Sequence, residues 1–163
     1  MGNLKPVAKA SMDVALSFVA INAPLLRLWL TGVDSKSGLY DAYSNVTLTL
    51  GELDVVKGGP SGGACGLVCL AIALAKAKLT CRLLVTGSVD LRGKLGTVGG
   101  IMGKTKAGRD VDVERFIIPS ENLKQLEDGD YAGWPDDLKA YGKKVLCGAT
   151  NVVDLFELGL DGE

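Results

Sequence analysis

Hydrophobic and polar positions recur with two different periods along the chain, and these periods predict both helices and strands. Apolar residues recur at helical spacing from about Lys5 to Val19, which predicts an amphipathic helix. Pro24 is expected to end or kink that helix. Segment 46–50 alternates apolar and polar residues with β-branched side chains, a pattern typical of a half-buried strand. No element is assigned to residues 25–44.

The second half of the chain alternates apolar runs of helical length with runs of strand length. Residues 61–78 form a long apolar, alanine-rich run, which predicts a buried helix. The further elements predicted here are strands at 82–86, 115–119 and 144–147, a hairpin at 88–95, a short helix at 99–108 capped by Gly108, and helices at 121–126 and 152–160. This alternation predicts an α/β (α+β) class.

Length and charge bound the class of protein further. The 163 residues suit one domain, taken as residues 1–163. The 18 lysine and arginine residues almost balance the 19 aspartate and glutamate residues, so no nucleic-acid partner is expected. Polar residues and Pro24 interrupt the apolar run 14–30, which favours a packed helix over a membrane span. We expect an intracellular, cytoplasmic protein without a membrane partner.

The sequence contains no histidine, and this narrows the chemistry of any active site. A Ser-His-Asp triad, a Cys-His dyad and a histidine-ligated zinc site are excluded within this chain. The four cysteines lack paired C-x-x-C spacing, so reduced, buried thiols are expected rather than disulfides. No metal and no cofactor are predicted. A catalytic base would have to be lysine, a carboxylate, tyrosine or cysteine.

A glycine-rich turn surrounds Ser61 at the start of the predicted buried helix. It runs from Gly58 to Gly63. Unpaired N–H groups at a helix N-terminus carry partial positive charge and can hold the oxyanion of a tetrahedral intermediate. Ser61 is therefore a candidate nucleophile. The alternative interpretation is that its side chain only caps the helix.

Lys104 is the candidate base for such a serine. A lysine with its usual pKa, about 10.4, is almost entirely protonated at neutral pH, so a basic lysine needs an apolar setting away from carboxylates. Lys104 lies in the apolar, glycine-rich segment 98–105. The alternative is a solvated lysine on a short helix.

The same segment also resembles the end of a phosphate-binding P-loop. Gly103, Lys104 and Thr105 match the end of G-x-x-x-x-G-K-[ST], but Val98 occupies the position of the first glycine. No following strand ends in the aspartate that would hold Mg²⁺. Nucleotide binding is therefore the weaker hypothesis for this segment.

Several motifs, in order along the chain, resemble the proteolytic domain of Lon protease from about residue 46 to 160. The family's Pro-Ser-Ala-Gly, Thr-Gly-Glu, Leu-x-Gly and Gly-Gly-x-x-x-Lys motifs are similar to residues 60–63, 86–88, 91–93 and 99–104. Residues 118–122 look like the family's Ile-Pro-x-Glu-Asn turn, and the spacing of 104 − 61 = 43 residues fits the family. Residues 1–45 match it weakly.

The resemblance implies a serine endopeptidase with a Ser-Lys dyad that acts through an acyl-enzyme. The fold it implies has a mixed sheet and a buried helix that starts at the nucleophile. Ser61 would be the nucleophile, Lys104 the general base, and Thr86 the residue that orients the lysine. The nucleophile loop and oxyanion region would be formed by Gly59, Pro60, Ser61 and Gly62.

Three positions depart from the family pattern, and the departures affect regulation and specificity rather than the dyad. Gly58 stands where many members have an acidic residue, and Ser88 replaces the glutamate of Thr-Gly-Glu. Thr47 and Thr49 stand where some members have histidine.

The resemblance leaves the biological setting open. The expected partner is a polypeptide substrate, either an unfolded protein or a polyprotein. The chain is expected to be part of an ATP-dependent protease with an ATPase module, a stand-alone peptidase, or a viral protease similar to those of birnaviruses. Assembly into a homo-oligomeric ring is a further implication. The competing function is an inactive Lon-like module for oligomerisation or binding.

Overall fold

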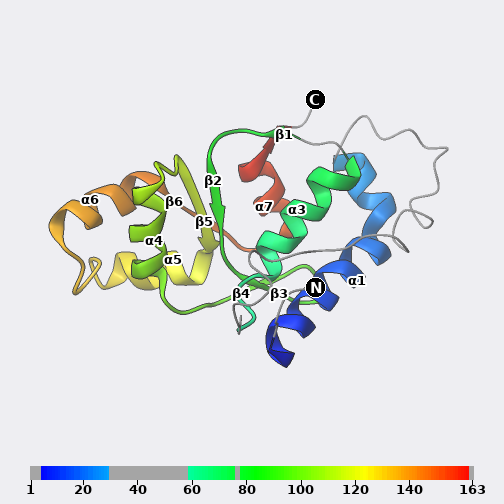
Figure 1. The fold of residues 1–163 in the computed structure, drawn as a ribbon, viewed down its shortest axis with the longest axis horizontal. Helices are drawn as coiled ribbons and strands as arrows, with labels where there is room; N and C mark the ends of the chain where they lie inside the picture. The colour runs from blue at the N-terminus through cyan, green and yellow to red at the C-terminus, as the bar shows by residue number, and fades with distance from the viewer. Residues whose placement is uncertain (1–4, 30–58, 76–77, 162–163) are drawn as a thin grey trace.

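The computed structural model describes residues 5–29, 59–75 and 78–161, in which helices alternate with short strands (Figure 1). The helices are α1 (Pro6–Trp29), α3 (Gly63–Ala75), α4 (Ile101–Asp110), α5 (Ser120–Asp128), α6 (Asp136–Val145) and α7 (Val152–Gly159). The strands are β1 (Lys78–Leu79), β2 (Leu83–Val85), β3 (Ser88–Val89), β4 (Leu95–Gly96), β5 (Arg115–Pro119), β6 (Leu146–Ala149) and β7 (Leu160–Asp161). The predicted α/β class is confirmed.

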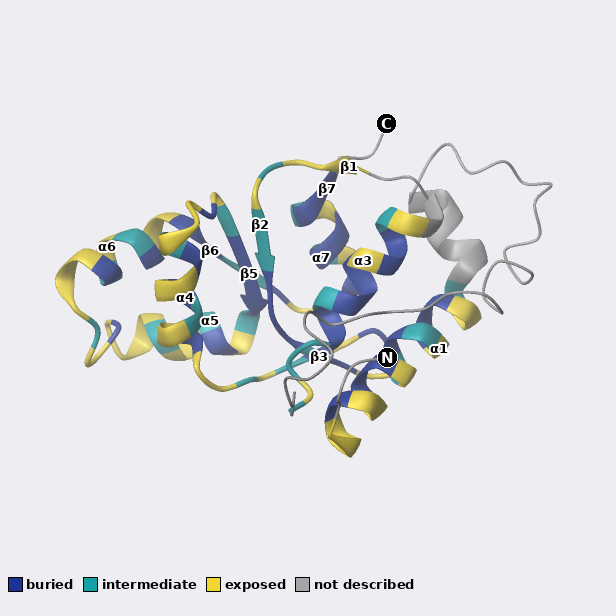
Figure 2. Cartoon of the chain, in the orientation of Figure 1, coloured by how far each residue is buried: buried dark blue, intermediate teal, exposed yellow. Residues whose placement is uncertain are grey.

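Within the described residues, a three-stranded parallel sheet with the order β2-β5-β6 separates two hydrophobic cores. Successive side chains of a strand point to opposite faces, and β5 shows this directly: Ile117 belongs to one core, whereas Phe116 and Ile118 belong to the other. The first core packs α1, α3 and α7 on one side of the sheet. The second packs α4, α5 and α6 on the other side (Figure 2). The remaining strands form two antiparallel pairs, β3-β4 and β1-β7.

The connections of the sheet place α4, α5 and α6 on the same face. Helix α4 lies between β2 and β5 in the sequence, and α5 and α6 lie between β5 and β6. Strands are thus added in one direction, and two parallel crossovers of the same hand then put their helices on one side. As a result α3 and α4 lie on opposite sides of β2, as Figure 1 shows.

Two helices of the first core, α1 and α3, form for different reasons. Pro6 occupies the first position of α1, where a missing N–H costs nothing, and the buried residues Ala8, Met12 and Ala15 recur along one face. Helix α3 is apolar almost all around, and it is central: it contacts α1, α7, β2 and β3. A helix without a polar face is stable only when other elements cover it.

Most elements predicted from the sequence are confirmed. These are the buried helix, the helices at 121–126 and 152–160, the strands at 82–86 and 115–119, and the hairpin at 88–95. The last predicted strand begins at Leu146, two residues later than expected, because α6 continues to Val145. The predicted strand at 46–50 lies outside the described residues.

Three expectations were wrong or incomplete. Helix α1 does not end at Pro24 but continues to Trp29. Gly108 does not cap α4: the helix ends at Asp110, and Gly108 is buried where a Cβ would lie 3.2 Å from Leu84. Helix α6 was not predicted, although acidic residues in its first turn and lysines in its last turn complement the helix dipole.

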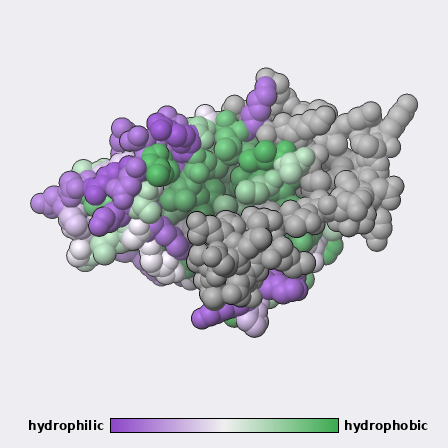
Figure 3. All heavy atoms as spheres, viewed as in Figure 1, coloured by the Kyte–Doolittle hydropathy of each residue, from purple (hydrophilic) through white to green (hydrophobic). Residues whose placement is uncertain are grey.

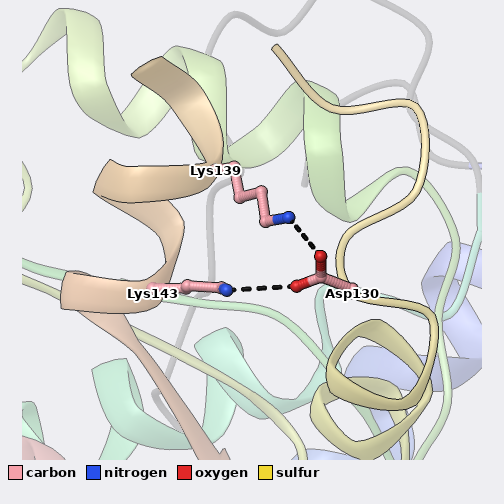
Figure 4. Close-up of polar contacts among 3 residues, drawn as sticks. All are labelled: Asp130, Lys139 and Lys143. Carbon is pink, nitrogen blue, oxygen red and sulfur yellow. Dashed lines mark hydrogen bonds and ion pairs between the residues drawn. The ribbon is translucent and has the colours of Figure 1, made fainter. Parts of the chain in front are cut away.

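A charged cluster lies at the turn between α5 and α6. Asp130 accepts hydrogen bonds from Lys139, at 2.6 Å, and from Lys143, at 3.1 Å, one turn apart on α6 (Figure 4). The two lysines hold the pKa of the Asp130 carboxyl below its usual range. Asp130 and Tyr131 both have positive φ, 44° and 55°, so these ion pairs help to hold a strained turn. Exposed ion pairs of this kind contribute little stability individually.

Hydrophilic and hydrophobic residues occupy different parts of the surface. Hydrophilic residues gather at the end that carries α4 and α6, and hydrophobic residues lie in the middle of the face shown in Figure 3. Among the described residues, no helix combines the length and the apolar character needed to cross a membrane.

Replacement of Leu67 tests whether the core around α3 holds the fold. Its side chain has no exposed surface, so Leu67→Ala is expected to lower the free energy of unfolding by roughly 3 kcal/mol through lost burial and a cavity. Leu91→Ala, at a residue that is 55% exposed, is the control. Urea unfolding of both variants measures the difference, and equal losses would contradict a core centred on α3.

Candidate active site

The loop around Ser61 is held by backbone hydrogen bonds to the segment that follows β2. The carbonyl oxygen of Ser61 accepts from Gly87 N at 3.0 Å, and Ala64 N donates to the Gly87 carbonyl oxygen at 3.0 Å. Gly59 has φ 94°, a left-handed conformation that favours glycine, and it lets the chain turn sharply into the loop. The start of α3 is therefore fixed to the carboxyl end of the central sheet.

The hydrogen bonds at the start of α3 do not support a cap made by Ser61. An N-cap side chain accepts a bond from an N–H of the first helical turn. Here Gly63 N donates to the Pro60 carbonyl oxygen, at 3.2 Å, and Ala64 N donates to Gly87. Ser61 is half-buried, and within the described part of the chain its hydroxyl makes no hydrogen bond. The Ser61 hydroxyl therefore does not act as the cap of α3.

Lys104 points from α4 toward the same end of the sheet. Its Nζ donates to Thr86 Oγ1 at 2.9 Å and to the Gly99 carbonyl oxygen at 3.0 Å. Partial burial lowers the pKa of the Lys104 ammonium below its usual range, because desolvation disfavours the charged form. The lysine is thus half-buried and bonded to neutral oxygens.

Thr86 connects the two candidate residues. Its buried hydroxyl accepts from Lys104 Nζ and donates to the Ser61 carbonyl oxygen at 3.2 Å. Thr86 follows β2, the strand between α3 and α4 in the sequence, so Lys104 of α4 and the loop before α3 meet at its side chain. In the described structure no hydrogen bond joins Ser61 Oγ directly to Lys104 Nζ. Such contacts often form only when substrate binds.

Two residues without a role assigned from the sequence support this arrangement. Asn122 is buried, accepts from Val98 N at 2.9 Å and donates to the Val98 carbonyl oxygen at 3.1 Å. It thereby fixes the segment that leads from β4 to Gly99, whose carbonyl oxygen accepts from Lys104. Ser11 of α1 donates to the Pro60 carbonyl oxygen at 2.8 Å. The sequence signal for both is a polar residue among buried positions.

The remaining candidates have simpler surroundings. Ser88, at the position of the family's glutamate, is half-buried at the start of β3. Gly58, Thr47 and Thr49 lie outside the described residues. All four cysteines are free, as expected, but none is fully buried: Cys69 is exposed, and the other three are half-buried.

The geometry of α4 does not suit a P-loop. Lys104 is bonded to Thr86 and Gly99. Thr105 is fully buried, and its hydroxyl donates to the Ile101 carbonyl oxygen at 2.9 Å. In a P-loop this hydroxyl would bind Mg²⁺. The arrangement of these residues therefore favours the serine and lysine pair over nucleotide binding.

Comparison with known proteins shows which family this sequence matches. Residues 1–140 match the Lon protease (S16) C-terminal proteolytic domain family. Lon protease of Desulfosudis oleivorans is 32% identical over 162 residues, which cover 99% of this chain and 18% of that protein. Peroxisomal Lon protease homolog 2 of Danio rerio is 33% identical over 152 residues, 93% of this chain and 17% of the homolog.

A further relative shows the same relationship over a shorter segment. Lon protease of Flavobacterium johnsoniae is 33% identical over 127 residues, 78% of this chain and 15% of that protein. The chain thus spans less than a fifth of the length of these relatives. The matched family range begins at residue 1, so it includes α1. The chain belongs to the Lon protease family, and it corresponds to the proteolytic domain of that family.

Proposed function

We propose that the chain is a serine endopeptidase in which Ser61 forms an acyl-enzyme and Lys104 is the general base. The observation that carries this proposal is the position of Thr86, whose hydroxyl contacts both the lysine Nζ and the backbone of Ser61. Membership of the Lon protease family supports hydrolysis of peptide bonds.

The proposed reaction begins with proton transfer. Neutral Lys104 takes the proton of the Ser61 hydroxyl while Oγ attacks the carbonyl carbon of the scissile bond. The oxygen of the tetrahedral intermediate carries the developing negative charge, and the Ser61 N–H is a donor for it. Protonated Lys104 then gives its proton to the leaving amine, and the C–N bond breaks. Water, activated by the same lysine, hydrolyses the ester.

Lys104 must be neutral to act as a base, and its surroundings favour that state. Burial lowers its pKa, and its two hydrogen-bond partners are neutral oxygens. An ion pair would have the opposite effect, since a nearby carboxylate stabilises the ammonium form.

The proposal extends to substrate and assembly. We propose that the substrate is an unfolded polypeptide or a polyprotein, and that no cofactor takes part in bond cleavage. A homo-oligomeric ring or an ATPase module elsewhere in a longer chain would deliver the substrate. The much greater length of the relatives fits the second arrangement.

Replacement of either dyad residue tests the reaction itself. Ser61→Ala and Lys104→Ala are each expected to lower cleavage of an unfolded protein such as casein by about 10⁴-fold or more, because the pair acts as a unit. Ser17→Ala and Lys106→Ala, at exposed positions on α1 and α4, are matched controls. Labelling of Ser61 by a fluorophosphonate separates an active peptidase from an inactive module. Full cleavage by both dyad variants would contradict the proposal.

Substitution of Thr86 tests the bridge between the two residues. Thr86→Val keeps the shape of the side chain but removes the acceptor for Lys104, so kcat should fall by about 10- to 100-fold while KM changes little. Thr86→Ser keeps the hydroxyl and should stay close to the parent. Steady-state kinetics on a fluorogenic peptide give both parameters. If Thr86→Val is as active as Thr86→Ser, the Thr86 hydroxyl has no role in the mechanism.

The pH dependence of stability tests the state of Lys104. Because its pKa in the folded chain lies below the unfolded value, about 10.4, the unfolded chain binds more protons between the two values. The stability of the parent should therefore rise with pH in this window relative to Lys104→Met. Urea unfolding from pH 7 to pH 10 measures the difference, and Lys106→Met corrects for loss of a lysine on α4. A difference that does not change with pH would refute partial desolvation of Lys104.

A further inference from the structure

The hydroxyl of Ser11 reaches from α1 to the loop that carries the candidate nucleophile. It donates to the Pro60 carbonyl oxygen at 2.8 Å, across 49 positions of sequence. Ser11 is only 7% exposed and lies among apolar residues of the buried face of α1. A helical serine often bonds to the carbonyl four residues earlier in its own helix, whereas this one bonds to a different segment.

The contact between α1 and the loop is close, because the loop has glycine at two positions that face α1. A Cβ at Gly63 would lie 2.6 Å from Ser11 Oγ, and a Cβ at Gly62 would lie 2.9 Å from the end of the Met12 side chain. The Pro-Ser-Ala-Gly motif of the resemblance has alanine where this chain has Gly62. Here the end of Met12 occupies that space.

The bond to Pro60 fixes the peptide unit that contains the Ser61 N–H. The Pro60–Ser61 bond is trans, so its C=O and N–H point in opposite directions in one plane. The Pro60 oxygen accepts from Ser11 Oγ and from Gly63 N. The next carbonyl, that of Ser61, is held by Thr86 and Gly87. Rotation of the peptide unit is thus restricted on both sides.

The Ser61 N–H itself has no acceptor among the described residues. The carbonyl groups on both sides of this N–H are held by hydrogen bonds, whereas the N–H itself is not. These are the properties of an oxyanion donor. The direction of this N–H depends on Ser11. Ser11 holds the Pro60 carbonyl oxygen, and that oxygen lies on the opposite side of the same planar peptide unit.

We propose that Ser11 is a positioning residue that orients the Ser61 N–H toward the oxyanion of the tetrahedral intermediate. Helix α1 is then part of the catalytic apparatus, although it contributes no reacting group. This inference rests on the proposed function of Ser61, and it adds a second support to the site beside Thr86.

Substitution of Ser11 tests the proposal in the full 163-residue chain. Loss of an oxyanion donor lowers kcat by about 10²- to 10³-fold, and a loosened donor retains part of that effect, so Ser11→Ala should lower kcat roughly tenfold. KM should stay within about twofold, because ground-state binding does not use the oxyanion donor. Ser17→Ala, at an exposed serine of the same helix, is the matched control and should match the parent. Ser11→Thr keeps the hydroxyl and should recover most of the activity.

A peptide aldehyde provides a measurement that a general loss of structure would not reproduce. Its hemiacetal with Ser61 places an oxygen at the oxyanion position, so its affinity should fall by the same factor as kcat/KM. An uncharged peptide of the same sequence without the aldehyde should bind Ser11→Ala and the parent equally. Unchanged kcat, or a lower kcat with unchanged aldehyde affinity, would overturn the role of Ser11.

Two further variants separate a role of Ser11 in catalysis from a loss of folding and from a failure of the proposed function. If Ser11→Ala loses cooperative melting, Ser11→Cys, which keeps the shape of the side chain but donates weakly, carries the same kinetic comparison. Ser61→Ala is assayed beside it. Cleavage by Ser61→Ala would refute the proposed function, whereas an inactive Ser61→Ala with a fully active Ser11→Ala would refute only the role of Ser11.

Discussion

The hydrogen bonds of the Thr86 hydroxyl are the interaction on which the geometry of the candidate site depends. The sheet places α3 and α4 on opposite faces, so Ser61 and Lys104 approach each other only at the carboxyl end of β2. Thr86 occupies that end, and its one hydroxyl satisfies a donor from one helix and an acceptor from the other loop. Ligands of open α/β sheets also bind outside the carboxyl ends of the strands.

Close packing against glycine is the second condition of this arrangement. A Cβ at Gly87 would lie 3.3 Å from Ala64 and 3.4 Å from Leu95, so the segment after Thr86 can approach α3 because it lacks a side chain. Gly63 plays the same part toward α1. The glycines of this loop thus allow a close approach in which backbone groups bond to backbone groups.

The sequence predicts the parts of the fold that depend on neighbouring residues better than the parts that depend on contacts between distant residues. Strand β5 was predicted at its observed bounds because its burial is continuous and Pro119 ends the run. Helix α1 continues past Pro24 although a proline interrupts helical hydrogen bonding, and local rules alone did not anticipate that. Gly108 was predicted to be a cap but is a buried position in tight contact with Leu84, a residue 24 positions earlier.

The same limit applies to the candidate site. Ser61, Lys104 and Thr86 could be picked out because each lies in a short local motif, and the structure brings them together through Thr86. Their catalytic roles stay proposals. Ser11 and Asn122 act on backbone groups 49 and 24 positions away, and no local pattern encodes such a pairing.

The buried polar residues show what the fold maintains at this site. Within the described residues they are Ser11, Thr86, Thr105 and Asn122. Burying a polar group is costly unless it is hydrogen-bonded, and an apolar replacement would leave the backbone partner of such a group unpaired. Each of these side chains bonds to the backbone of the loop around Ser61, of α4 or of the segment before α4. They therefore serve the fold and the candidate site together, because the backbone groups that they hold are those that position Ser61 and Lys104.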